Sequence, residues 1–132
     1  MTTAIICTAI LAAMLFLLGF NVSRQRGETA KAGGSQMPTD PASPLLIAIR
    51  AHGNAAEYVP TLIVLFLLVG ARTHAWVAVP LIVAATATRL LHAYAMLTAK
   101  SLAAEVPLRL VGAIGTYLFG VALALAAALS LL

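Results

Sequence analysis

Charged residues are scarce in this sequence, and acidic residues are the scarcest. Of 132 residues, 9% are charged and 62% are hydrophobic, with 8 lysines and arginines against 4 acids. A soluble globule needs more polar surface than this composition supplies, whereas lipid tolerates an apolar exterior. The composition therefore predicts an integral membrane protein in contact with membrane lipid.

Other absences remove whole classes of function. The single cysteine, Cys7, excludes an intrachain disulfide and is expected to be a small buried hydrophobe. The basic residues do not cluster among aromatics, so nucleic acid is not an expected partner. His52, His92 and Glu57 lack the i, i+3 or i, i+4 spacing of a helical metal site, so no metal is predicted. With no catalytic serine triad or phosphate-binding loop, an enzyme here would take its nucleophile from a bound cosubstrate.

The sequence has four long apolar runs. They predict an all-α fold, a bundle of four transmembrane helices forming one domain over 1–132. The expected helices are about 3–23, 44–70, 75–98 and 106–131, with a long polar loop over 27–43 that is rich in glycine, proline, serine and threonine. Ser43 and Pro44 supply an N-cap and a proline at the first position of the second helix. Pro60 is expected to bend that helix.

The distribution of basic residues predicts the orientation in the membrane. The first and third connections share one side and carry Arg24, Arg26, Lys31 and Lys100, whereas the other side has Arg72 alone. The positive-inside rule then places both termini outside and the polar ends of the helices toward the cytoplasm.

The most informative stretch runs from Arg50 to Pro60 and reads R-A-H-G-N-A-A-E-Y-V-P. On a helix, Arg50, Asn54 and Glu57 lie within an arc of about 60° and so share one face. An ionised side chain costs about 2.5–3.5 kcal/mol at the bilayer centre by insertion scales and less near an end. This face is therefore expected to meet something polar. His52 points away from it, which favours a packing role.

Other polar residues are expected to reach the same leaflet. They are Arg24 at the end of the first helix, Arg89 and His92 on one face of the third, and Arg109 at the start of the fourth. Together they predict a shared pocket. Ion pairs that only fix helix packing are an alternative for Arg50 and Glu57. The excess of arginines over the one intramembrane glutamate favours an anionic ligand instead, since buried arginines cannot shed their protons.

The stretch from Arg50 to Pro60 resembles the signature of the MAPEG family, the membrane-associated proteins in eicosanoid and glutathione metabolism. The pattern R-x-x-x-N-x-x-E-x-x-P within an apolar helix carries the likeness, which covers essentially the whole chain. The resemblance implies a homotrimer that binds glutathione between subunits. It further implies detoxification chemistry, in which glutathione is conjugated to lipophilic electrophiles or reduces hydroperoxides.

The resemblance also implies roles for individual residues. The residues that match the family's glutathione-binding positions are Arg24, Arg50, Asn54, Glu57, Tyr58, Arg89 and His92. Arg109 resembles the fourth-helix arginine that stabilises the thiolate, and would be the catalytic residue. The chemistry agrees, because glutathione carries two carboxylates and one ammonium, which suit several arginines around one glutamate.

Two further functions remain open at this point. The family's enzymes often carry a tyrosine one turn beyond the position of His92, where this chain has Met96. A non-catalytic relative that binds lipid or a partner is therefore the second hypothesis. A small multidrug transporter also fits four spans, but those proteins resemble one another in a first-helix glutamate, which this first helix lacks.

Overall fold

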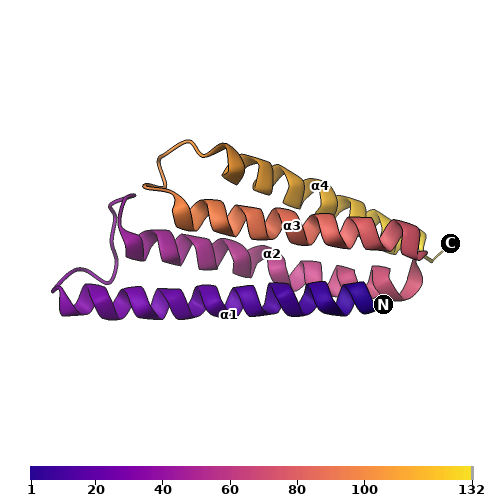
Figure 1. Ribbon diagram of the computed structural model, residues 1–132, viewed down its shortest axis with the longest axis horizontal. Helices are drawn as coiled ribbons and strands as arrows, with labels where there is room; N and C mark the ends of the chain where they lie inside the picture. The colour runs from indigo at the N-terminus through magenta and orange to yellow at the C-terminus, as the bar shows by residue number, and fades with distance from the viewer. Residues whose placement is uncertain (132) are drawn as a thin grey trace.

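The structure, a computed structural model, consists of four long helices (Figure 1). It describes residues 1–131, and residue 132 of the predicted domain lies outside them. The helices are α1 (Thr2–Lys31), α2 (Pro44–Arg72), α3 (Ala75–Thr98) and α4 (Pro107–Leu129). Each is long and apolar enough to cross a bilayer. The predicted fold class, an all-α integral membrane bundle of four helices, is confirmed.

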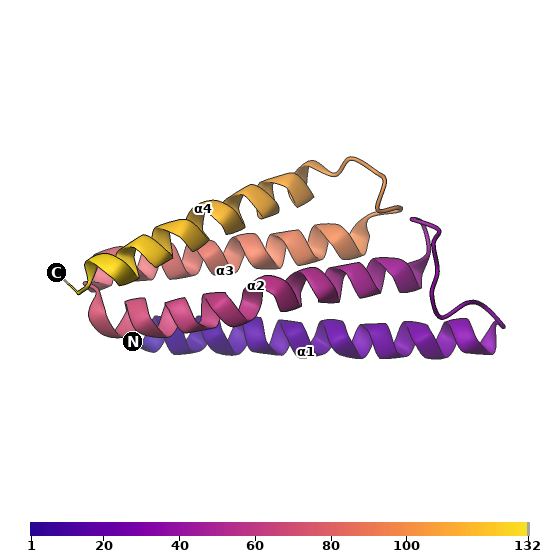
Figure 2. The same ribbon diagram turned by 180° about the vertical axis from the view of Figure 1, so that it is seen from behind.

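The helices alternate in direction. Figures 1 and 2 show both termini and the α2–α3 turn at one end of the bundle, and the two longer loops at the other. Only Thr73 and His74 separate α2 from α3, and so short a connection makes the two helices antiparallel neighbours. Within the described residues α4 contacts α2 and α3 but not α1. Polar side chains of α1 and α4 are therefore kept apart within one chain.

The first helix is longer than the sequence predicted. It continues to Lys31, so the prediction of an end near residue 23 is wrong. The polar connection is correspondingly shorter and covers 32–43 instead of 27–43. A helix of 30 residues rises about 45 Å, more than the roughly 30 Å of the hydrocarbon core. Its last turns therefore project beyond the hydrocarbon on the side of the long loops.

Local interactions explain this extension. Arg24 and Glu28, four residues apart, form an ion pair of 2.7 Å, which stabilises an exposed helix. The helix ends at Lys31, two residues before Gly33, which adopts a φ of 69°, a left-handed conformation that other residues rarely adopt. The amide of Gly33 donates to the carbonyl of Ala30 at 3.0 Å. Polar composition alone did not distinguish a solvated helical turn from a loop.

The second helix begins where the sequence predicted. The amide of Leu46 donates to the Ser43 hydroxyl at 3.4 Å, and Pro44 occupies the first turn, where its missing N–H costs nothing. Pro60 lies inside the helix, which continues through it to Arg72. Figure 2 shows α2 changing direction about midway along its length. The two halves of α2 consequently follow different paths through the bundle.

The core is apolar and the exterior is apolar as well. Phe66 and Val59 of α2, Ile82 of α3 and Leu123 of α4 are fully buried where the helices meet. Cys7 is buried in the same core, as expected of a small hydrophobe. Large exposed hydrophobic residues also cover the outer faces, and they include Phe16, Leu17, Phe20, Leu118, Val121 and Leu125. Such a surface suits lipid, so the chain is an integral membrane protein.

Helices α3 and α4 approach closely at two glycines of α4. A Cβ atom added at Gly112 would lie 2.7 Å from the backbone nitrogen of His92, and one at Gly115 would lie 2.4 Å from Cγ2 of Thr88. Both distances are below van der Waals contact. These glycines let the two backbones pack together, as small residues do between membrane helices.

We therefore expect Gly112→Ala to destabilise the bundle, because the opposing atoms belong to the backbone of α3 and cannot rotate away. The strain of overpacking typically costs about 1–3 kcal/mol. Thermal unfolding in detergent measures the effect. Gly120→Ala is the matched control on the same helix, since nothing lies within 4 Å of its added Cβ. Equal melting temperatures for the two variants would contradict this packing.

Candidate functional site

Arg89 is the centre of the polar contacts within the membrane-spanning region. Its side chain is 1% exposed, although it carries a permanent charge. One terminal nitrogen donates to Oδ1 of Asn54 at 3.0 Å, and the other donates to the Thr116 hydroxyl at 3.5 Å. The guanidinium carbon also lies 5.2 Å from the centre of the Tyr58 ring, within cation–π range. Arg89 thus joins α2, α3 and α4.

Within residues 1–131 no carboxylate forms an ion pair with this buried charge. The ion pair between Arg24 and Glu28 is the one pair found among residues 1–131. The buried Nε of Arg89 has no hydrogen-bond partner in the described chain. A buried polar group without a partner is costly, so this arginine is energetically unfavourable for the single chain.

Two residues of this cluster were not identified from the sequence. Thr116 accepts from Arg89 and itself donates to the carbonyl of Gly112 at 2.8 Å. The hydroxyl of Tyr58 donates to that of Tyr117 at 3.3 Å, and the two rings lie 5.7 Å apart. The sequence did contain a signal for them, since Thr116 and Tyr117 are adjacent polar residues within the fourth apolar run.

Three polar residues of α2 face outward. Arg50, Glu57 and Thr61 are exposed, and Asn54 and Tyr58 on the flank are half-buried toward α3 and α4. Neither Arg50 nor Glu57 forms an ion pair within residues 1–131. The stripe predicted from the sequence therefore exists, and in a single chain its charged members are uncovered.

His92 and Arg109 form a separate group at the end of the bundle with the long loops. Nδ1 of His92 donates to the carbonyl oxygen of Arg109 at 2.9 Å. A carbonyl only accepts, so the proton must be on Nδ1, and a neutral ring then offers Nε2 as an acceptor. Both residues line a cavity of about 640 Å³ together with Glu105, Pro107 and Leu110.

The guanidinium of Arg109 bonds to the connection between α3 and α4. Its two terminal nitrogens donate to the carbonyls of Leu102 and Ala104, both at 3.0 Å. The amide of Leu102 in turn donates to the carbonyl of Pro41 at 2.8 Å. Arg109 therefore organises this loop as well as lining the cavity. Carbonyl oxygens carry only partial charge and do not neutralise the arginine.

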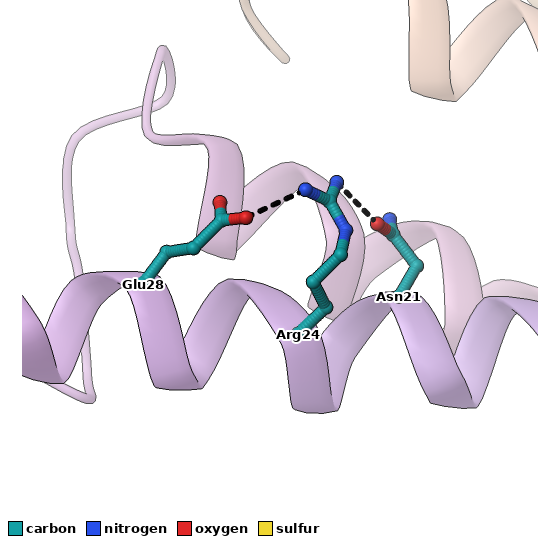
Figure 3. A network of polar contacts seen from close by, with 3 residues as sticks. All are labelled: Asn21, Arg24 and Glu28. Atoms are coloured by element: carbon teal, nitrogen blue, oxygen red, sulfur yellow. Dashed lines mark hydrogen bonds and ion pairs between the residues drawn. The ribbon is translucent and has the colours of Figure 1, made fainter.

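Arg24 lies on α1 and interacts with that helix alone. Figure 3 shows its guanidinium between two side chains of the same helix, 2.7 Å from Oε1 of Glu28 and 3.0 Å from Oδ1 of Asn21. The single shared pocket predicted from the sequence is therefore not formed within one chain. Arg24 is on the helix that does not contact α4, and α2 presents its charges outward.

His52 has the packing role that its direction on the helix indicated. A Cβ atom added at Gly19 of α1 would lie 3.3 Å from Nε2 of His52. The imidazole therefore packs against the α1 backbone, away from Arg89. Within residues 1–131 no three histidine, cysteine, aspartate or glutamate side chains come together as metal ligands.

These features define a class of protein, a small four-helix membrane protein that carries arginines at separate positions on α2, α3 and α4. A family model for the MAPEG family matches residues 4–129. The chain belongs to the MAPEG family, and so to the membrane-associated proteins in eicosanoid and glutathione metabolism. A search of the curated proteins and a search of the solved structures found no match.

Proposed function

We propose that the protein binds glutathione and uses it as a transferase or peroxidase on lipophilic electrophiles or hydroperoxides. The observation that carries this proposal is the outward stripe of α2, where Arg50 and Glu57 have no ion-pair partner within residues 1–131. Charges in that position need a ligand or another subunit. Glutathione suits them, because its carboxylates match arginine and its ammonium matches glutamate.

The remaining residues of the proposed site follow from the same contacts. Arg89 holds Asn54 and lies beside Tyr58, so it positions the inner edge of the stripe. His92 and Arg109 supply an acceptor and a positive charge beside the adjoining cavity. Arg24 would join the site from the first helix of a neighbouring subunit.

We further propose that the protein is a homotrimer in a bacterial inner membrane. A single chain leaves the α2 stripe uncovered, and a second subunit packed against it would complete the site. Both termini would face outside and the site the cytoplasm, because the end with the long loops carries Arg24, Arg26, Lys31 and Lys100.

Activity with glutathione tests the proposal directly. The purified full chain is incubated with glutathione and either a chlorodinitrobenzene-type electrophile or a lipid hydroperoxide. We expect a rate above the no-enzyme control for at least one acceptor. Glutathione binding without turnover on any acceptor would support the second hypothesis, a non-catalytic lipid- or partner-binding relative, and would overturn the enzymatic proposal.

Arg109 is proposed to stabilise the thiolate, so Arg109→Ala is expected to lower kcat while leaving much of the glutathione binding intact. The pH optimum should move upward, because the pKa of the bound thiol would relax toward about 8.5. Arg109→Lys should restore part of the rate, since it keeps the charge but loses the planar fork. Steady-state kinetics against pH measure both effects.

The loop contacts of Arg109 call for a folding control. A thermal melt of each variant separates loss of the bonds to Leu102 and Ala104 from loss of chemistry. A wild-type kcat and pH profile in a folded Arg109→Ala variant would show that the thiol-activating arginine is another residue.

A further inference from the structure

Two cavities on the surface of α1 and α3 meet end to end. The first, of about 360 Å³, lies at the end with the long loops and is lined by Asn21, Arg24, Gln25, Pro44 and Lys100 among others. The second, of about 520 Å³, is a groove along α1 and α3 lined by Met14, Leu17, Leu18, Leu90, Ala93 and Tyr94 among others. Asn21 and Leu97 line both. The two cavities therefore form one continuous surface.

The cavity at the end with the long loops is cationic. It is lined by Arg24 and Lys100 and by no carboxylate. Arg24 is neutralised by its ion pair with Glu28, whereas Lys100 forms no ion pair among the described residues and supplies the uncompensated positive charge. The N-terminus of α2 at Pro44 borders the same cavity and adds the positive end of a helix dipole. Amides of Asn21 and Gln25 add neutral hydrogen-bonding groups beside these charges.

The groove along α1 and α3 is apolar, and its length is about the thickness of one leaflet. Its lining on α1 runs from Ile10 to Asn21, which is about 16 Å along a helix, or about half of the hydrocarbon core. Leu17 is 67% exposed and Tyr94 61% exposed, so the groove is open to the lipid. It lies where α1 meets α3, whereas Arg50 and Glu57 point outward from α2.

We propose that this surface binds an anionic phospholipid. The phosphate lies against Lys100 and the N-terminus of α2 at the headgroup level, and one acyl chain lies in the groove between α1 and α3. A basic pocket that opens into an apolar groove at the cytoplasmic ends of transmembrane helices matches the order of groups in such a lipid. The site goes beyond the proposed function and is independent of whether the protein is catalytic.

Native mass spectrometry of the full chain tests the proposal. The protein in mild detergent is mixed with equal amounts of phosphatidylglycerol and phosphatidylcholine that have identical acyl chains. We expect preferential retention of phosphatidylglycerol, and Lys100→Gln should reduce that preference about fivefold. Lys31→Gln is the matched control, because Lys31 is an exposed lysine near the same end that lines neither cavity. Equal retention of the two lipids, or an equal loss in both variants, would overturn the proposal.

The acyl groove is tested separately by Ala13→Phe, which places a large side chain in the groove. This variant should lower retention of both lipids, whereas Ala128→Phe, on an exposed face of α4, should not. Excess glycerol phosphate should fail to displace the lipid, because it lacks the acyl chains. Displacement by glycerol phosphate would show a simple phosphate site and overturn the proposal. Dissociation of an oligomer by Ala13→Phe without any change in lipid retention would assign the groove to a subunit interface, and would also overturn it.

Discussion

Replacing Arg89 by methionine should leave the bundle about as stable as the wild type while weakening glutathione binding about tenfold. A buried charge without a carboxylate partner is costly, and apolar residues of similar volume often replace such groups without loss of stability. The bond to Asn54 and the cation–π contact with Tyr58 would both be lost, so two proposed glutathione-binding side chains would no longer be held in position before the ligand binds. Ordering these two side chains on binding is expected to cost about 1.4 kcal/mol, which corresponds to roughly a factor of ten in affinity.

Calorimetric titration with glutathione and a thermal melt measure the two quantities on one sample. Arg72→Met is the control, since Arg72 is exposed at the opposite end of the bundle. The melting temperature of Arg89→Met should fall by no more than about 5 °C. Loss of folding together with binding would mean that Arg89 serves stability. A shifted pH optimum in the steady-state kinetics of Arg89→Met would instead assign the thiol-activating role to Arg89 on α3.

Glu57→Gln should raise KM for glutathione by about tenfold or more and change kcat little. The carboxylate is proposed to pair with the ammonium of glutathione, a contact made equally in the ground and transition states. A hydrogen bond to a charged group contributes about 1.5–3 kcal/mol, and each 1.4 kcal/mol is a factor of ten. Steady-state kinetics with varied glutathione provide the measurement.

Asp40→Asn is the matched control for Glu57→Gln. It also removes one negative charge, but from the exposed connection, where Asp40 accepts from the amide of Ala42 and asparagine can do the same. Its kinetics should be those of the wild type. An unchanged KM in the Glu57→Gln variant would exclude an ammonium contact at this position.

The fold was largely predictable because long apolar runs permit few structures in a bilayer. Only helices and closed barrels satisfy every backbone hydrogen bond in lipid, so four such runs specify four helices. The start of α2 followed from Ser43 and Pro44, whose capping chemistry is local. The end of α1 was missed because it depends on an ion pair at Arg24 and on the conformation of Gly33, neither of which composition describes.

The candidate site was predictable in part. Helical periodicity placed Arg50, Asn54 and Glu57 on one face, since that depends on spacing alone. Contacts between helices depend on their relative rotation and distance, which spacing does not give. The contact of Arg89 with Thr116 and the bonds of Arg109 to loop carbonyls therefore emerged only from the structure.

The central claim is that the charged stripe on α2 is covered by a neighbouring subunit with glutathione between the two. Native mass spectrometry of the full chain in mild detergent with added glutathione tests it most directly. We predict a species with the mass of three chains that carries glutathione, because Arg50 and Glu57 have no ion-pair partner within the described chain. Monomers alone, with glutathione absent at every concentration, would contradict the claim.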